Sequence, residues 1–246
     1  MSRVLSFVTC ATDPGVLNRY LLASPCLSSG EYGQTVYLHA PSVGAAFNRE
    51  IIRQRQTLWL VWAHQDLFLP HGWDTRFIAA LAEAERRFPC LAVVGVYGIT
   101  GVGEQARRAG KVLDRGLLLH EPAPLPSLVD SIDELLFAVR TDSGLQLDSS
   151  LGFDFYGTDL ALQAQAQGLQ VAVVDACCEH WAQTPRETGF SSAMLERIAA
   201  SGAIFEHKWV HRIPLETPCF SIRCPGDVAA QCRAFAKSSS HEPATF

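Results

Sequence analysis

The chain has 246 residues, of which 48 % are hydrophobic and 18 % are charged, and its formal net charge is −5. This composition excludes a disordered chain, and the negative charge gives no general attraction to nucleic acid or to an anionic membrane surface. No apolar run reaches the ~18 residues that a membrane span needs. The short apolar start, residues 4–11, is better explained as a first strand than as a signal peptide. We therefore expect a compact cytoplasmic protein without a transmembrane segment or a nucleic-acid partner.

The eight cysteines do not form the spacing of a disulfide scaffold or of a zinc finger. The chain has no Cys-x-x-Cys pair, and Cys219, Cys224 and Cys232 lack zinc-finger spacing. We expect most of the cysteines to be buried as small hydrophobic residues.

Strand-like apolar runs alternate with helical patterns through the first hundred residues. Strands are predicted over residues 4–10, 35–39, 57–63 and 91–97. Ser42 can cap one helix, and Phe77, Leu81, Ala84 and Phe88 recur at the spacing of a helix with one apolar face. This alternation predicts an α/β fold, with a mostly parallel central sheet flanked by helices.

The second half of the chain has a less regular pattern. It predicts short strands over residues 117–120, 132–139 and 171–174, with Asp133 facing the end of the sheet where chemistry would occur. A helix is expected from Gly157 to Gly168, because glycine is a frequent helix stop. Periodicity fades after about Pro218. We therefore predict one domain over residues 1–218 and a C-terminal extension over residues 219–246, whose last residues are loose.

The glycine-rich stretch over residues 95–103 follows a predicted strand, but its glycine spacing is not that of a dinucleotide-binding loop. No glycine triplet in it satisfies G-x-G-x-x-G, and the sequence contains no P-loop pattern. We interpret the stretch as a flexible loop at the lip of a site.

The chemistry-bearing residues with the best placement are Asp66, Asp159 and His180. Asp66 follows a buried strand within His64-Gln65-Asp66, at the position where open α/β sheets bind ligands. Its oxygens suit Mg²⁺ or Mn²⁺, and Mn²⁺ also accepts the nitrogen that His180 offers. A metal held there could neutralise a leaving diphosphate. Asp159, at a helix start, either satisfies backbone amides or acts as a general base.

Two longer segments resemble the family 2-like glycosyltransferases of the GT-A fold. The first covers residues 48–70 and ends on Trp62-Ala63-His64-Gln65-Asp66-Leu67-Phe68-Leu69-Pro70. It is similar to the branch that writes the Asp-x-Asp metal motif as His-Gln-Asp. The second runs from Phe153-Asp154-Phe155-Tyr156-Gly157-Thr158-Asp159-Leu160 through the strand at 171–175 to His180. Residues 205–209 and 213–215 resemble the C-terminal end of that branch.

The resemblance implies a nucleotide-diphosphate sugar as donor and Mn²⁺ or Mg²⁺ as cofactor. It implies that Asp66 and His180 bind the metal and that Asp159 is the base, with Asp154 as its rival. The donor would be contacted by four further residues: Thr9, Asp13, Asn48 and His64. Thr9 and Asp13 would lie beside the nucleotide base, and His64 replaces a carboxylate that normally contacts ribose or metal.

These observations predict a metal-dependent glycosyltransferase that transfers a sugar to an acceptor hydroxyl of a glycan, a lipid-linked molecule or a small molecule. Inversion is expected because a single displacement needs one base. Processive synthesis is not expected, because the Gln-x-x-Arg-Trp motif is absent. Two alternatives stay open: a nucleotide-sugar-binding module without turnover, and a metal-dependent hydrolase that uses His64, Asp66 and His180.

Overall fold

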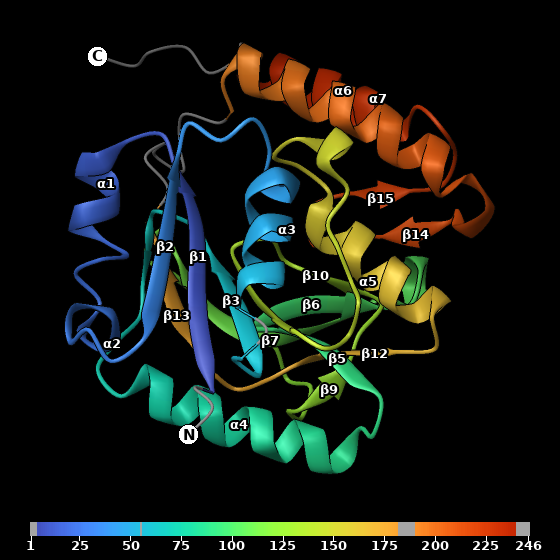
Figure 1. The fold of residues 1–246 in the computed structure, drawn as a ribbon. Coiled ribbons are helices and arrows are strands. Elements are labelled where there is room, and N and C mark those ends of the chain that lie inside the picture. Colours follow the sequence, from blue (N-terminus) through green and yellow to red (C-terminus); the bar gives the residue numbers. More distant parts are fainter. Residues whose placement is uncertain (1–3, 55, 182–189, 240–246) are drawn as a thin grey trace.

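A computed structural model describes residues 4–54, 56–181 and 190–239 of the chain. It contains a seven-stranded sheet in the order β2-β1-β3-β11-β5-β12-β9 (Figure 1). In chain order these strands are β1 (Leu5–Ala11), β2 (Gly33–Leu38), β3 (Trp59–Ala63), β5 (Leu91–Gly95), β9 (Ser127–Leu128), β11 (Leu136–Arg140) and β12 (Gln170–Val173).

Five of the seven strands of this sheet run in the same direction, which agrees with the prediction of a mostly parallel sheet. Strand β1 pairs in parallel with β2 and β3, and β5 pairs in parallel with β12. Strand β11 is antiparallel to both β3 and β5, so β3 and β5 run in the same direction. Strand β9 also runs against its neighbour β12. The carboxyl ends of β1, β2, β3, β5 and β12 therefore meet at one edge of the sheet.

Helices cover both faces of this sheet, as the alternating pattern predicts. The described helices are α1 (Pro14–Arg19), α2 (Pro25–Ser28), α3 (Val43–Arg53), α4 (Trp73–Arg87), α5 (Tyr156–Ala166), α6 (Ser192–Lys208) and α7 (Asp227–Ser239), of which α1 to α5 pack on the sheet. Helix α4 buries Trp73, Phe77 and Leu81 against one face, together with apolar residues of α1 and α2. Helices α3 and α5 bury Phe47 and Leu160 against the other. The α/β class is therefore confirmed.

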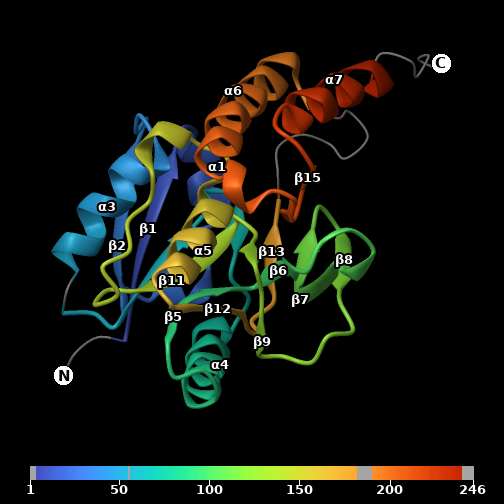
Figure 2. The same ribbon diagram turned by 90° about the vertical axis from the view of Figure 1, so that its right-hand side faces the viewer.

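A second sheet crosses the carboxyl-end edge of the first. Its order is β10-β6-β7-β13-β4, and β8 pairs with β7. The bounds are β4 (Leu67–Phe68), β6 (Tyr97–Thr100), β7 (Arg107–Asp114), β8 (Leu117–His120), β10 (Ser131–Ile132) and β13 (Cys178–His180). Figure 2 shows the β7–β8 hairpin on the side of the molecule opposite α3. This sheet brings β4 and β13 together at the end of β3.

The glycine-rich stretch is not the flexible loop that we predict from sequence. Strand β5 ends on Gly95, and β6 covers residues 97–100. A Cβ at Gly98 would lie 2.6 Å from the backbone oxygen of Ser131 on the adjacent strand. The glycine therefore permits a close approach of two strands, which its spacing alone did not reveal.

The predicted strand over residues 132–139 is broken. Strand β10 ends at Ile132 in the second sheet, and β11 begins at Leu136 in the first. In the turn between them, Asp133 Oδ1 accepts a hydrogen bond from the backbone of Leu135 at 3.0 Å. The segment passes from one sheet to the other, which a continuous apolar run does not show.

The C-terminal segment is more ordered than the sequence indicates. The antiparallel pair β14 (Leu215–Glu216) and β15 (Ser221–Ile222) crosses the predicted boundary at residue 218. Helix α7 then packs side by side with α6 in both views. Val228 and Cys232 are buried at helical spacing, and Glu206 of α6 accepts hydrogen bonds from the backbone of Val228 at 2.9 Å. Residues 219–239 are therefore part of the main body, and residues 240–246 lie outside the described residues.

The cysteines are less buried than expected. All eight are free, but only Cys26, Cys178 and Cys232 are buried. Within the described residues, no helix combines the length and the apolar character needed to cross a membrane.

Candidate metal and donor site

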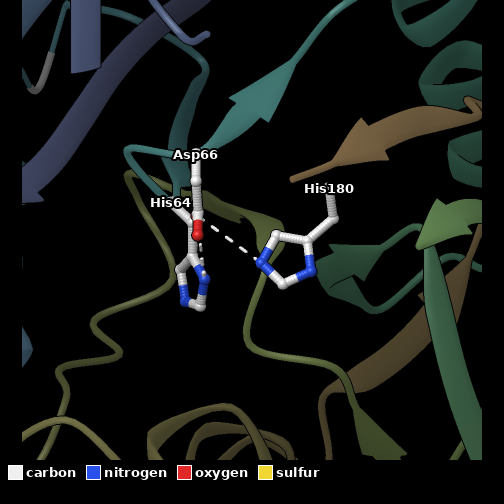
Figure 3. Close-up of side chains that lie close together, drawn as sticks. All are labelled: His64, Asp66 and His180. Atoms are coloured by element: carbon white, nitrogen blue, oxygen red, sulfur yellow. Dashed lines mark ion pairs between the residues drawn. The ribbon is translucent and has the colours of Figure 1, made fainter. Parts of the chain in front are cut away.

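Three side chains meet where β3 leaves the large sheet. His64 and Asp66 follow the last residue of β3, and antiparallel pairing of β13 with β4 places His180 opposite Leu67. One ligand atom from each of these three residues lies within 4.8 Å of the others (Figure 3). Asp66 Oδ1 is 3.5 Å from His180 Nε2 and 3.9 Å from His64 Nδ1. The predicted meeting of Asp66 and His180 is thus observed, and His64 joins them.

The hydrogen bonds around His64 leave one ring nitrogen available to a cation. The Tyr156 hydroxyl lies 3.2 Å from the backbone oxygen of Glu134, to which it can donate its single proton. Burial raises the pKa of Tyr156 well above its usual value, so the phenol keeps that proton. It therefore accepts from His64 Nε2, at 2.8 Å. Burial also lowers the pKa of His64 to about 4, so the ring is neutral and its Nδ1 lone pair faces Asp66.

A second carboxylate fixes the orientation of His180. Asp114, the last residue of β7, lies 2.8 Å from His180 Nδ1, which leaves Nε2 facing Asp66. Burial alone would lower the pKa of His180, but its hydrogen bonds to Asp114 and Asp66 raise it to about 9. Burial likewise opposes ionisation of Asp66, yet the bond from His180 and the two imidazoles bring its pKa to about 2. A bound cation would take the place of the proton on His180.

The three residues fit a divalent cation. They offer one carboxylate oxygen and two imidazole nitrogens, a donor set that suits Mn²⁺ better than Mg²⁺ because Mg²⁺ prefers oxygen ligands. Each histidine is oriented through its other nitrogen, as metal-binding histidines usually are.

Substituting Asp114 with asparagine is expected to weaken Mn²⁺ binding about 10–100-fold, because the carboxylate that orients His180 and raises its basicity is lost. Isothermal titration with Mn²⁺ measures the affinity. Asp142→Asn, which removes an exposed carboxylate paired with Arg140, is the control and should bind Mn²⁺ as the unchanged protein does. Equal affinities for both variants would show that Asp114 does not act on the site.

Gln65 ties this cluster to the loop after β1. Its Oε1 accepts hydrogen bonds from the backbone of Thr12 at 3.0 Å and of Asp13 at 3.1 Å. The Asp13 side chain in turn caps α1 by accepting from the backbone of Gly15 and Val16. The loop that carries Asp13 is therefore held next to His64 and Asp66, at the carboxyl ends of adjacent strands.

Thr9 and Asn48 have no described contact with the cluster. Thr9 is buried in β1, and its hydroxyl donates to the backbone oxygen of Cys10. The amide of Asn48 bonds both the backbone oxygen and the backbone nitrogen of Leu147, at 2.8 Å each. Their predicted contacts with a donor nucleotide stay predictions, and the observed bonds of Asn48 give it a structural role.

Asp159 does not reach the cluster. It is 0 % exposed in the first turn of α5, and its oxygens are taken by three side chains. Trp209 Nε1 donates at 2.7 Å, Lys208 Nζ lies at 2.7 Å and Gln163 Nε2 at 2.6 Å. The predicted role of Asp159 as general base finds no support in this geometry, because a base needs an oxygen open to its substrate.

Asp154, the rival base, is paired with a cation. Both of its oxygens accept from Arg197 of α6 at 3.0 Å, and Ser201 adds a bond at 3.2 Å. Its side chain is 11 % exposed. A carboxylate whose two oxygens are both bound by a guanidinium has no oxygen left open to a substrate hydroxyl.

Sequence reasoning missed the residues that support the cluster from other elements. Asp114 and Tyr156 carry no spacing signal relative to His64-Gln65-Asp66. Glu134 follows Asp133, which the sequence analysis predicts to face the functional end of the sheet. The acidic pair Asp133-Glu134 is therefore the sequence signal that could have indicated Glu134.

A cavity of about 650 Å³ opens between the β6–β7 hairpin and the β14–β15 pair. Its lining includes Ile99, Arg107, Arg108 and Arg223, but no residue of the metal cluster. It is therefore a feature separate from the candidate site.

No protein-family model matches the chain, and no curated protein matches its sequence. Solved structures with some likeness of fold are found at low sequence identity. GalNAc-T7 with UDP, GalNAc and Mn²⁺ has a TM-score of 0.49 at 10 % identity, over 97 % of this chain and 54 % of that one. Residues 1–349 of S. aureus TarS in complex with UDP-GlcNAc have a TM-score of 0.43 at 8 % sequence identity, and the match covers 82 % of this chain and 66 % of that chain. A197 from STIV has a TM-score of 0.42 at 11 % sequence identity, and the match covers 71 % of this chain and 82 % of that chain.

The chain spans about half of the GalNAc-T7 chain. With identities of 8–11 % and TM-scores below 0.5, these likenesses do not assign an activity. The functional assignment depends on the residues of the site itself.

Proposed function

We propose that the protein is a metal-dependent glycosyltransferase that transfers a sugar from a nucleotide-diphosphate donor to an acceptor hydroxyl, by inversion and without processive synthesis. The observation that carries this proposal is the cluster of His64, Asp66 and His180 at the carboxyl end of β3. Family 2-like glycosyltransferases of the His-Gln-Asp branch, which the sequence resembles, are the class that the proposal implies.

The residues divide the work of donor binding. Two imidazole nitrogens and one carboxylate would hold Mn²⁺ or Mg²⁺, and the bound cation would neutralise charge on the leaving diphosphate. Gln65 holds the loop of Thr12 and Asp13 beside the cluster, where the nucleoside would lie. Ligands of open α/β sheets bind at this edge, outside the carboxyl ends of the strands.

A second candidate function is a nucleotide-sugar-binding module without turnover. The observation that favours it is that both carboxylates predicted as bases are engaged, Asp159 with Lys208 and Asp154 with Arg197. The two functions share the donor site and differ only in whether a free base faces the acceptor.

Melting the protein with UDP, GDP, CDP and dTDP, each with and without Mn²⁺, tests the donor site. A ligand at 100 times its dissociation constant stabilises the folded state by about 2.7 kcal/mol. For a chain of this size each kcal/mol raises the midpoint by roughly 2–4 °C. We expect one nucleotide to raise it by several degrees only when Mn²⁺ is present, because the cation joins the protein carboxylate to the diphosphate.

Donor hydrolysis to free sugar and nucleotide diphosphate then separates the enzyme from the binding module. A midpoint that rises with Mn²⁺ alone, without nucleotide preference, would favour the metal-dependent hydrolase. If no nucleotide changes the midpoint at up to millimolar concentration, the donor site built on Asp66 and His180 is wrong.

A further inference from the structure

The hydroxyl group of Tyr156 links the backbone of Glu134 to His64 of the candidate metal cluster. The Glu134 backbone oxygen accepts from Trp62 Nε1 at 3.0 Å and lies 3.2 Å from the Tyr156 hydroxyl, which also contacts His64 Nε2. The next residue, Leu135, accepts a hydrogen bond from the backbone of His64 at 3.0 Å. The turn between β10 and β11 therefore holds Glu134 beside the exit of β3.

The Glu134 side chain points toward the start of α5. Its Oε1 accepts from the backbone nitrogen of Gly157 at 3.1 Å. A Cβ at Gly157 would lie 3.0 Å from Glu134 Cγ and 3.0 Å from the backbone oxygen of Ile132, so only glycine leaves room for this approach. The segment over residues 153–160, which resembles the glycosyltransferase family, thus lies against Glu134.

The two carboxylate oxygens of Glu134 differ in their described contacts. Oε1 accepts from Gly157, whereas Oε2 has no hydrogen-bond partner among the residues that the structure describes. Glu134 is half-buried, so part of the residue is reached by solvent.

The surroundings of Glu134 favour proton uptake. Burial raises the pKa of its carboxyl well above the usual value, and the charges of Asp154 and Asp133 act in the same direction. The bond from Gly157 and the charge of Arg197 oppose this shift without cancelling it. A raised pKa makes a carboxylate a better proton acceptor in catalysis.

Three other carboxylates are each engaged by basic side chains. Asp159 is bound by Lys208, Asp154 by Arg197, and Asp114 by both His180 and Arg115. Glu134 and its neighbour Asp133 have no ion pair within 4.0 Å among the described residues, and of these two Glu134 is the one whose carboxylate contacts the start of α5.

We propose that Glu134 is the general base of the transfer, a role that rests on the proposed glycosyltransferase function. The acceptor hydroxyl gives its proton to Glu134 Oε2 while its oxygen forms a bond to the anomeric carbon of the donor sugar. The bond from that carbon to the diphosphate oxygen breaks, and its electron pair leaves with the nucleotide diphosphate. Oε1 stays bonded to Gly157, which fixes the orientation of the carboxylate.

Glu134→Gln tests this role, because the amide oxygen can still accept from Gly157 while the base is lost. The probe is the hydrolysis of UDP-, GDP-, CDP- and dTDP-glucose with Mn²⁺, in which water replaces the acceptor. We expect a fall in turnover of about 10²–10⁴-fold with an unchanged melting shift by nucleotide and Mn²⁺. Glu85→Gln, which removes a surface carboxylate paired with Arg140, is the matched control and should keep full turnover.

The pH profile separates a base from a helix cap. In the unchanged protein, turnover should fall as the pH is lowered and Glu134 becomes protonated. The same fall at low pH should be seen in Glu134→Asp, at a lower overall rate. It should be absent in Glu134→Gln. Turnover of Glu134→Gln within threefold of the unchanged protein would limit Glu134 to capping α5. A protein that binds nucleotide with Mn²⁺ but hydrolyses none of the donors would overturn both the base and the enzyme, whereas loss of nucleotide binding itself would overturn the donor site.

Discussion

Substituting Asp159 with alanine is expected to lower the free energy of unfolding by about 3 kcal/mol, because it removes a fully buried carboxylate and leaves its hydrogen-bond donors without that partner. Asp159 is 0 % exposed, and its oxygens are the partners of Lys208 Nζ and Trp209 Nε1. Without the Asp159 oxygens the indole N–H of Trp209 is left unpaired in the core, whereas Lys208 keeps its ion pair with Asp148 at 2.8 Å. Thermal unfolding should show a midpoint about 10 °C lower, at roughly 2–4 °C for each kcal/mol.

The control for this variant removes the other partner of the same lysine. Asp148→Ala acts on a carboxylate whose side chain is 27 % exposed, so it should cost less than about 1 kcal/mol. A variant of Asp159 that melts as the unchanged protein does but has lost turnover would contradict the structural role and restore Asp159 as the base.

Substituting Asp66 with asparagine is expected to abolish the stabilisation of about 2.7 kcal/mol that nucleotide and Mn²⁺ together provide at 100 times the dissociation constant. A neutral amide is a poor ligand for a divalent cation, and His64 and His180 would remain as two nitrogen donors without a carboxylate. The ligand-free variant should still fold, with a slightly lower midpoint because His180 loses one of its two carboxylate partners.

Asp142→Asn is the matched control here as well, because Asp142 is 68 % exposed and lies in an ion pair on the surface. It should keep the full melting shift. An equal shift in Asp66→Asn and in the unchanged protein would remove Asp66 from the metal site.

Several features of the fold and the site could be predicted from the sequence because they depend on local patterns. An apolar run of strand length predicted β3, and the polar residues that follow it predicted the end of that strand. Ser42 caps α3 as predicted, with its hydroxyl accepting from the backbone of Ala45 at 3.1 Å. Asp66 and His180 follow or end strands, so the rule that ligands bind at strand ends was sufficient to bring them together.

The partners of the site could not be predicted, because they come from strands and helices that are distant in the chain. Asp114 reaches His180 only through the parallel pairing of β7 with β13, 66 residues apart. Tyr156 reaches His64 across 92 residues. Neither pairing register is encoded in the spacing of the polar residues themselves.

The assignment of roles among the carboxylates was decided by tertiary structure alone. A carboxylate in the first turn of a helix gives the same sequence signal whether it is free to accept a proton or buried against a cation. For Asp159 the folding of α6 against α5 supplies Lys208 and Trp209, and for Asp154 it supplies Arg197. Glu134 lies where the chain turns between two sheets, and its Oε2 has no hydrogen-bond partner among the described residues. The sequence by itself therefore determined the α/β class and the strand end that carries the candidate metal site, while the packing of α6 decided that Asp154 and Asp159 are engaged by cations.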